Sequence, residues 1–320
     1  MDSARKVIEA ELAEFESHFR AAVKSRVSLL DRIMQYIVKR KGKQLRPMFV
    51  LLSAKLGGPV NDATYRAASL VELLHTATLV HDDVVDDAMQ RRGFFSLNAL
   101  WKNKIAVLVG DYLLSKGLLL SLQNRDFTQL EILSEAVKQM SEGELLQMEK
   151  SRRLNLEEDI YYEIINGKTA SLLASACAVG AATTFTDPVD INRMKDFGQK
   201  VGMAFQVKDD LFDYGTADIG KPTGNDIKEK KLTLPLIYTL NHCAPDLKRK
   251  IIYIVKNNHN DPAKVRFVID AVQQSGGIRY ATQKMFEFRD EALKVLHEFP
   301  LSQTRQALED LVRFTTDRNF

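Results

Sequence analysis

The chain has 320 residues, of which 45% are hydrophobic and 27% charged, so it is long enough to bury a large globular core. Its 45 basic and 42 acidic residues leave a net charge of +3, which is too balanced for a nucleic-acid-binding protein, and we expect no nucleic acid partner. The two cysteines, Cys177 and Cys243, lack zinc-site spacing and offer no disulfide framework, which favours the reducing cytoplasm.

The sequence predicts helices along almost its whole length. Residues 1–19 are amphipathic and acidic, unlike a signal peptide, and no proline interrupts residues 60–187. Apolar residues recur at threes and fours in 70–77, 108–118 and 172–179, as they do on the buried face of a helix. Sustained strand-like alternation is hard to find, so we expect an all-α protein.

Turn-forming residues divide the predicted helices. Breaks are expected at 57–59, around Gly93, and at 123–126, 183–188, 214–226 and 257–261. The most apolar window, 104–122, contains Asp111 and Lys116 and is too interrupted to span a bilayer. No linker or low-complexity segment is visible, so we predict one all-α domain over residues 1–320.

The stretch HDDVVDD at 81–87 runs against the rules of helix formation. It ends an apolar run, SLVELLHTATLV, and so places carboxylates near the end of a buried-looking helix. Like charges four residues apart repel each other, and negative charge near a helix C-terminus opposes the helix dipole. The pattern D-D-x-x-D at 82–86 recurs at 209–213 after a second apolar helix. Two identical motifs favour a functional role over the alternative, which is solvated surface acids.

The spacing of the two acidic motifs suits a divalent cation. Residues four apart share a helix face, so Asp82 lies with Asp86, and Asp209 lies with Asp213. Mg²⁺ typically takes one or two carboxylates together with water and substrate phosphates. Two such faces turned toward each other would line a cavity able to hold cations, and we predict Mg²⁺ as the cofactor.

Cationic residues lie near small or helix-breaking residues at several points. They are Lys43, Arg46, Arg91, Arg92, Lys168, Lys221 and Lys231. Arginine forks and lysine point charges can hold phosphate oxygens without a P-loop, and the sequence has no P-loop motif. Each cation alone is better explained as surface charge, but together with the acids they indicate a diphosphate substrate. His75 and Gln206 lie near the faces of Asp82 and Asp209, although either could be only structural.

These segments together resemble the trans-isoprenyl diphosphate synthase family, the polyprenyl synthetases. The shared motifs occur in the family's order within residues 41–238 and are GKQLRP, HTATLVHDDVVDD, RRG, GDYLLS, GKTASL, FQVKDDLFD and GKPTGNDIKEKKLTLPL. The resemblance implies a single-domain, isoprenoid-synthase-type helical bundle around a central cavity. It also implies a homodimer that is cytosolic or loosely associated with a membrane.

The resemblance assigns a role to each candidate site residue. The positions of the family's metal ligands are matched by Asp82, Asp86 and Asp209. The supporting acids are Asp83, Asp210 and Asp213, and these six carboxylates together with Lys168 are the expected catalytic residues. The positions that bind the diphosphate of isopentenyl diphosphate are matched by Lys43, Arg46, His75 and Arg92. The positions around the allylic diphosphate are matched by Arg91, Lys168, Thr169, Gln206, Lys221 and Lys231.

The activity implied by the resemblance is repeated condensation of isopentenyl diphosphate with an allylic diphosphate such as farnesyl diphosphate. Mg²⁺ and the cations would stabilise charge on the departing diphosphate. The isopentenyl double bond would then attack the allylic cation, and a proton would be lost. Phe205, Thr169 and Gln206 would line the path of the cation.

Product length is expected to depend on the residues just before the first acidic motif. Ala77 and Thr78 lie five and four residues before Asp82, where a bulky aromatic closes the tunnel in the family's short-chain members. Small residues there predict a medium- or long-chain product of the kind used for quinone side chains, with Leu74 further along as part of the tunnel floor. Tight helix packing is the alternative explanation of these small residues.

Other functions stay open. The nearest are a short-chain geranylgeranyl diphosphate synthase and a non-catalytic partner subunit of a heteromeric synthase, although this chain keeps both acidic motifs. A terpene cyclase would carry a different second metal motif, and a phosphohydrolase using His75, His81 and Asp82 would leave the second motif unexplained. The chain departs from the family's usual pattern at 94–96 and 225–226. We expect weak membrane association because a long polyprenyl product must leave into lipid.

Overall fold

The structure is a computed structural model that describes residues 1–39, 42–91, 93–151, 157–215 and 223–317. The helices before the second acidic motif are α1 (Asp2–Val7), α2 (Glu9–Ala22), α3 (Ser28–Lys39), α4 (Leu45–Gly57), α5 (Asp62–Val85), α6 (Leu97–Asn124), α7 (Phe127–Ser151), α8 (Glu158–Ile165), η1 (Asn166–Ala170) and α9 (Ser171–Ala181). The helix carrying that motif and those after it are α10 (Pro188–Phe212), α11 (Asn225–Lys228), α12 (Leu234–His242), α13 (Pro245–Asn257), α14 (Pro262–Ser275), α15 (Gly277–Leu296) and α16 (Gln303–Asp317).

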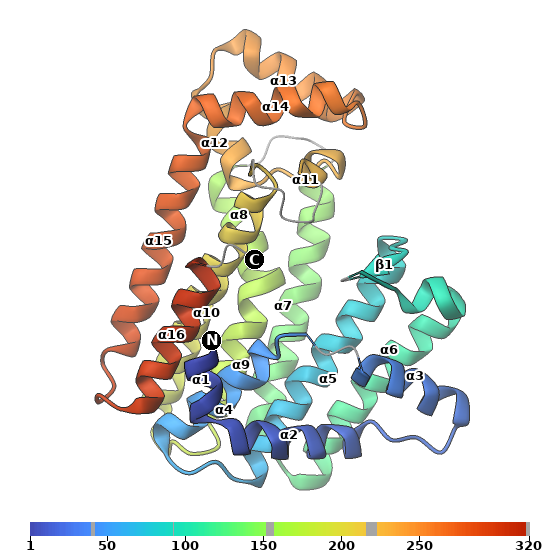
Figure 1. Ribbon diagram of the computed structural model, residues 1–320, viewed down its shortest axis with the longest axis vertical. Helices are drawn as coiled ribbons and strands as arrows, with labels where there is room; N and C mark the ends of the chain where they lie inside the picture. The colour runs from blue at the N-terminus through green and yellow to red at the C-terminus, as the bar shows by residue number, and fades with distance from the viewer. Residues whose placement is uncertain (40–41, 92, 152–156, 216–222, 318–320) are drawn as a thin grey trace. The chain divides into compact units, whose positions relative to one another are not determined.

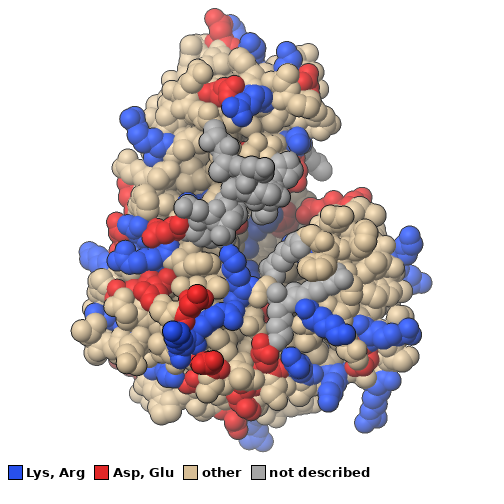
Figure 2. Space-filling model, viewed as in Figure 1, with Lys and Arg blue, Asp and Glu red and all other residues tan. Residues whose placement is uncertain are grey.

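The only strands among the described residues form one short antiparallel hairpin. They are β1 (Gln90–Arg91) and β2 (Phe94–Phe95), with Gln90 opposite Phe95. The all-α prediction is therefore confirmed (Figure 1). Lysine and arginine side chains are interspersed with acidic ones over the face drawn in Figure 2, as the small net charge leads one to expect.

The chain divides into two compact units, each with its own core. Unit 1 consists of Met1–Val137, Ser175–Lys195 and Pro300–Leu308, and unit 2 consists of Lys138–Ala174, Asp196–Phe299 and Glu309–Phe320. The first acidic motif belongs to unit 1 and the second to unit 2. That both belong to one domain stays a prediction.

Unit 1 is built around α5 and α6, which run side by side (Figure 1). Helix α5 starts with a capping box between Asn61 and Thr64, which satisfies amide groups in its first turn. Glycines let α6 approach closely, because a Cβ at Gly117 would lie 2.9 Å from a methyl carbon of Leu70. The helix that carries the first acidic motif is therefore fixed along its length by close packing.

Helix α6 contains a backbone conformation that costs free energy. Lys102 has φ 72° and ψ 157°, close to a region that essentially only glycine occupies. We expect Lys102→Gly to stabilise the protein by about 1 kcal/mol, because relief of strain exceeds the added flexibility of glycine. Urea denaturation would measure the change. Lys116→Gly in the regular part of α6 is the control and should cost about 1 kcal/mol. A loss of stability in both variants would contradict the prediction.

Unit 2 has a core formed mainly by α8, α10, α12, α13, α14 and α15. Between α8 and α9 the backbone N–H of Ser171 donates to the carbonyl of Asn166, five residues back, so η1 is a turn of π-helix. This turn is tightly packed on both sides. A Cβ at Gly143 of α7 would lie 2.9 Å from the amide nitrogen of Lys168, and one at Gly202 of α10 would lie 2.5 Å from Cα of Ala170. Backbone contacts thus fix the position of Lys168 and its neighbours.

Two described stretches are long and apolar enough to cross a membrane, namely Leu97–Asn124 and Glu158–Ala181. In the second stretch, 78% of the most apolar window is buried inside the structure, as in a core helix, whereas the share in the first is 33%. Core helices of soluble proteins pass the same test, so it is weak evidence for a membrane span. The expectation that residues 104–122 do not span a bilayer stays a prediction.

Candidate active site

The first acidic motif occupies the last turn of α5. Asp86 is the C-cap, and its backbone N–H donates to the carbonyl of Asp82 at 2.8 Å, so the two carboxylates are one helical turn apart. Asp82 is half-buried and Asp86 is exposed. The last turn of α5 itself contains no basic residue. The motif therefore concentrates negative charge at the end of the helix dipole that least favours it.

A Schellman motif closes this turn. The N–H of Ala88 donates to the carbonyl of Asp83 at 2.9 Å, and the N–H of Asp87 to the carbonyl of Val84 at 3.4 Å. Asp87 adopts the left-handed conformation, with φ 47°, that glycine usually supplies in this motif. The final carbonyls of α5 are thus satisfied by the backbone, which keeps the helix end formed in spite of its charges.

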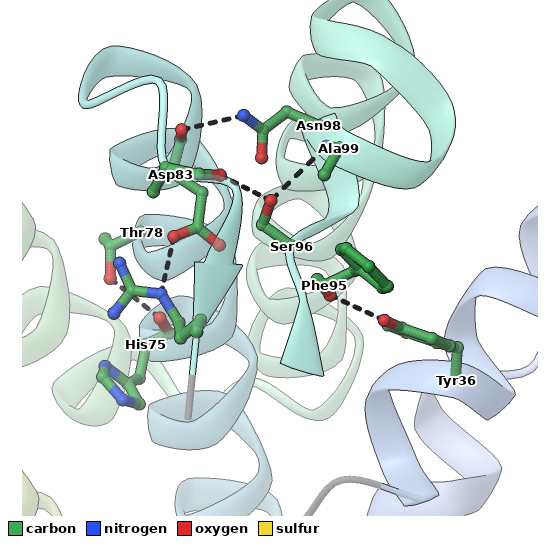
Figure 3. A network of polar contacts seen from close by, with 10 residues as sticks. Tyr36, His75, Thr78, Asp83, Phe95, Ser96, Asn98 and Ala99 are labelled. Atoms are coloured by element: carbon green, nitrogen blue, oxygen red, sulfur yellow. Dashed lines mark hydrogen bonds and ion pairs between the residues drawn. The ribbon is translucent and has the colours of Figure 1, made fainter. Parts of the chain in front are cut away.

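Asp83 lies inside unit 1 and ties the hairpin to the helices. Its carboxylate accepts from Nε of Arg91 at 2.6 Å, and its backbone carbonyl accepts from the side-chain amide of Asn98 at 3.1 Å (Figure 3). Burial raises the pKa of Asp83, while the ion pair with Arg91 acts in the opposite direction. The hairpin is also held from α3, because the Tyr36 hydroxyl donates to the carbonyl of Phe95 at 2.6 Å. Arg91, a predicted diphosphate ligand, is thus positioned by an acid of the first motif.

The other predicted ligands in unit 1 lie on α4 and α5 or just before α4. His75 is buried, 7% exposed, two turns before the first acid of the motif. Lys43 is exposed, and its backbone carbonyl accepts from the Arg5 guanidinium at 2.9 Å. Arg46 is half-buried in the first turn of α4. Arg92 lies outside the described residues.

The predicted chain-length residues lie on one unbroken helix, α5. Leu74 is 3% exposed and Ala77 is 2% exposed. Ala77 belongs to a hydrophobic cluster that includes Ala106 and Val109 of α6. Thr78 is half-buried, and its hydroxyl donates to the carbonyl of His75 within the helix at 2.8 Å. Their role in product length stays a prediction.

The second acidic motif ends α10 in unit 2, and Asp210 is its buried member, 5% exposed. One carboxylate oxygen accepts from the Tyr161 hydroxyl at 2.7 Å, and the other accepts from the Gln206 amide at 2.9 Å. The Gln206 carbonyl in turn accepts from the Thr169 hydroxyl at 2.7 Å. A continuous chain of hydrogen bonds therefore connects η1, α10 and α8.

Asp213 has a structural role just beyond the end of α10. Its two carboxylate oxygens accept from the backbone N–H groups of Asn225 and Asp226 at 2.8 and 3.1 Å, at the start of α11. Its backbone carbonyl accepts from the N–H of Gly224 at 3.0 Å. Burial raises the pKa of Asp213, and these backbone donors act in the opposite direction. The third acid of the motif thus anchors the segment that returns to the site.

A pocket with a cavity volume of about 150 Å³ lies beside the second motif within unit 2. It brings together five residues predicted from sequence, namely Lys168, Thr169, Gln206, Asp210 and Lys231. Ile164, Ile165 and Leu232 form an apolar part of its wall. The pocket can thus hold a molecule with an anionic end and an apolar body. Lys221 lies outside the described residues.

Two acids of this pocket have strongly raised pKa values. Burial raises the pKa of Asp210 to about 7 and that of Asp226 to about 8, while Lys231 lowers both. Lys168 forms an ion pair with Glu144 and donates to the Gln147 side chain at 3.3 Å. Such buried acids beside cations are typical of functional sites.

No group of three or more His, Cys, Asp or Glu side chains poised to hold a metal ion occurs among the described residues. Mg²⁺ does not need one, because it is commonly bound by one or two carboxylates with water and substrate phosphates. The hard carboxylate oxygens of Asp82 and Asp86, one turn apart and not fully buried, fit that requirement.

A model of the polyprenyl synthetase family matches residues 27–272, which is more than half of the chain. The chain belongs to the polyprenyl synthetase family. It is therefore a prenyltransferase, as the resemblance of its motifs to the family implied.

Members of the family resemble this chain along almost its whole length. It is 33% identical over 297 residues to the octaprenyl diphosphate synthase of Escherichia coli, a match that covers 92% of each chain. It is 35% identical over 312 residues to an all-trans-nonaprenyl-diphosphate synthase (geranyl-diphosphate specific) of Rhodobacter capsulatus, covering 96% of this chain and 95% of the relative.

Solved structures from the family share the fold. A polyprenyl synthase from Caulobacter crescentus, crystallised with calcium and isoprenyl diphosphate, matches with a TM-score of 0.93 and 33% identity over 100% of this chain and 98% of that one. A geranylgeranyl pyrophosphate synthase from Bacteroides thetaiotaomicron matches with a TM-score of 0.85 and 34% identity over 99% of this chain and 100% of that one. The isoprenoid-synthase-type fold is thus confirmed, and both long and short products occur among similar proteins.

Several residues of the unit 2 pocket were not among the predicted site residues, and they include Gln147, Lys150, Tyr161 and Asp226. Gln147 and Lys150 are three residues apart near the end of α7, a spacing that places them on one helix face. Tyr161 precedes Lys168 by seven residues, about two turns, which is the signal that sequence reasoning could have used. Asp226 stood out only as part of a departure from the family pattern.

Proposed function

We propose that this chain is a Mg²⁺-dependent polyprenyl diphosphate synthase that condenses isopentenyl diphosphate repeatedly with an allylic diphosphate. The observation that carries the proposal is the unit 2 pocket, where Lys168, Thr169, Gln206 and Lys231 lie beside the second acidic motif. Cations next to buried acids and an apolar wall suit an allylic diphosphate, which has an anionic head and an apolar chain. The product is a medium- or long-chain all-trans polyprenyl diphosphate that supplies the side chains of quinones. The enzyme itself acts in the cytoplasm.

Asp82, Asp86 and Asp209 would hold Mg²⁺, which when bound supplies positive charge for the diphosphate as it leaves. Lys168 and Lys231 add point charges for the same diphosphate oxygens. On unit 1, Lys43, Arg46, His75 and Arg92 bind isopentenyl diphosphate, and Arg91 binds the allylic substrate from a position fixed by Asp83. These cations divide between the two diphosphates, so that each substrate has its own set.

The reaction needs no side-chain nucleophile. Breaking the allylic C–O bond produces pyrophosphate and an allylic cation, and the π electrons of isopentenyl diphosphate then form the new C–C bond. Loss of a proton to the released pyrophosphate restores a double bond. Thr169 and Gln206, fixed in one hydrogen-bond chain, present oriented dipoles along the path of the cation.

Product length tests the proposal. Wild-type protein incubated with Mg²⁺, labelled isopentenyl diphosphate and farnesyl diphosphate is expected to yield chains longer than geranylgeranyl, separated by chromatography. Ala77→Phe and Thr78→Phe should shorten the product by at least one isoprene unit, because a ring at either position obstructs the growing chain. Ala77 is buried, so its variant also risks overpacking, which typically costs about 1–3 kcal/mol.

Thr76→Phe is the matched control for the half-buried Thr78, because each hydroxyl donates to a carbonyl of the same helix. Thr76 lies two residues away and so points to a different side of α5. It should leave the product distribution unchanged. A wild-type product that stops at geranylgeranyl would support the second candidate, a geranylgeranyl synthase, which is favoured by the similarity to the Bacteroides structure.

We also propose a homodimer, with weak membrane association through the product. Leu108, Leu119 and Leu122 of α6 are 60%, 49% and 48% exposed and recur on one helix face. A second copy of this chain could cover that face by two-fold symmetry, since a face that contacts itself needs no other partner. Light scattering of the purified chain would report a dimer, and a monomer that retains activity would contradict the proposal.

A further inference from the structure

Tyr161 of α8 is a buried polar residue to which the proposed reaction assigns no role. It is 3% exposed, and its hydroxyl donates to Asp210 at 2.7 Å inside unit 2. A tyrosine hydroxyl buried this deeply needs a hydrogen-bond partner, and a carboxylate makes that bond stronger than a neutral acceptor would. The partner here is the buried acid of the second acidic motif.

The bond from Tyr161 sets the orientation of the next groups along the hydrogen-bond chain. Tyr161 donates to one oxygen of Asp210, and the amide nitrogen of Gln206 donates to the other at 2.9 Å. With its nitrogen turned toward Asp210, Gln206 presents its carbonyl to Thr169, which donates its hydroxyl hydrogen at 2.7 Å. The direction of every hydrogen bond in the chain therefore follows from an Asp210 carboxylate held on both oxygens.

The hydrogen bond between Tyr161 and Asp210 lies next to the groups that we propose bind the diphosphate. Tyr161, Thr169, Gln206 and Asp210 all line the pocket that contains Lys168. Thr169 follows Lys168 within the π-turn, whose backbone is packed against Gly143 and Gly202. Helix packing thus fixes the backbone of this part of the pocket wall. The hydrogen-bond chain that starts at Tyr161 fixes the orientation of its side chains.

We infer that Tyr161 is a positioning residue for prenyl transfer, which holds Asp210 and through it orients Gln206 and Thr169 toward the allylic diphosphate. This inference rests on the proposed function. Tyr161 acts only through Asp210. Its loss should therefore change how tightly the site holds a Mg²⁺–diphosphate complex and how fast it reacts.

The neighbouring residue provides a matched control. Tyr162 is also on α8, and its hydroxyl also donates to a carboxylate, that of Glu158, at 2.8 Å. Tyr161→Phe and Tyr162→Phe each remove one tyrosine–carboxylate hydrogen bond from the same helix. Only the first bond belongs to the chain that reaches Gln206 and Thr169. A purely structural role would therefore give both variants similar properties.

The experiment compares the two variants as full-length protein. Titration calorimetry would measure binding of inorganic pyrophosphate in the presence of Mg²⁺, and steady-state assays would measure kcat and the KM for isopentenyl diphosphate. Tyr161→Phe is expected to weaken pyrophosphate binding and to lower kcat by about 10- to 100-fold, the usual effect of removing a group that orients a ligand. Its KM for isopentenyl diphosphate should stay within about twofold of wild type, and Tyr162→Phe should stay within about twofold in every measurement.

A double-mutant cycle separates positioning from general destabilisation. In an Asp210→Asn background, Tyr161→Phe should lower pyrophosphate binding by less than about threefold, because the group that it orients is already altered. Equal effects of Tyr161→Phe in both backgrounds, or equal effects of Tyr161→Phe and Tyr162→Phe, would overturn the inference. If Tyr161→Phe does not fold, Gln206→Met removes the other hydrogen bond to Asp210 and should weaken pyrophosphate binding to a similar extent; unchanged binding would overturn the inference. Wild-type protein that binds pyrophosphate but condenses nothing would instead contradict the proposed function.

Discussion

Asp82→Asn is expected to lower kcat/KM for the condensation by about 1,000-fold or more, because it removes a carboxylate proposed to hold Mg²⁺ and a metal of this kind contributes several kcal/mol to the departure of a diphosphate. The same change should raise the free energy of unfolding by about 0.5 kcal/mol. It removes one negative charge from the C-terminal turn of α5, where negative charge opposes the helix dipole. Steady-state kinetics and urea denaturation of one preparation would measure both effects.

Asp87→Asn is the control for Asp82→Asn. Asp87 lies at the same helix end but outside the D-D-x-x-D pattern, and its left-handed backbone suits asparagine well. It should give a similar gain in stability while activity stays within about threefold of wild type. Two results would contradict this prediction: a loss of stability in Asp82→Asn, or an equal loss of activity in both variants. Either would show that Asp82 does not exchange stability of the helix end for activity.

Asp226→Asn is expected to stabilise the metal-free protein by about 2 kcal/mol or more at pH 9, and far less at about pH 4. Burial raises the pKa of Asp226 to about 8 from an ordinary value of 3.8. The folded chain therefore holds this proton more tightly than the unfolded chain does. The stabilisation that comes from this tighter proton binding is fully present below about pH 4. It is lost as the pH rises through about 8. Asparagine stays neutral, so its advantage over aspartate grows across the same range.

Thermal or urea unfolding at several pH values would measure this difference between wild type and Asp226→Asn. Asp246→Asn on α13 is the control, because the Asp246 side chain is 89% exposed and its charge costs little in water. Its effect should stay within about 0.5 kcal/mol at every pH. A gain for Asp226→Asn that is the same at pH 4 and pH 9 would show that the buried charge is not its cause.

The sequence predicted the long helices correctly because their apolar spacing and their proline-free runs decide the local structure. The expected breaks at 183–188 and 257–261 fall between α9 and α10 and between α13 and α14. The bend at Lys102 was not predicted, since neither glycine nor proline marks it. The π-turn was not predicted either. Gly167 lies inside a continuous helical run from α8 through η1 to α9, and its backbone is in close contact with Gly143.

The candidate site was predictable where a motif repeats and not where folding brings distant residues together. The D-D-x-x-D spacing correctly predicted that Asp82 and Asp86 lie one helical turn apart. The spacing could not reveal that Asp210 is held by a tyrosine 49 residues earlier. It also could not reveal that Asp213 anchors a short helix twelve residues later. Such roles depend on which helices pack together, and local sequence carries little information about that.

The π-turn at Asn166–Ala170 has a consequence for how the length of this chain can change. A turn that closes five residues back contains one more residue than an α-helical turn. Deleting one residue there would rotate Lys168 by about 100° relative to Tyr161 and turn it away from the pocket that both now line. The glycine contacts leave no room for an insertion to bulge outward. Length variation should therefore collect in the loops between helices, while the spacing from Tyr161 to Thr169 resists any change in length.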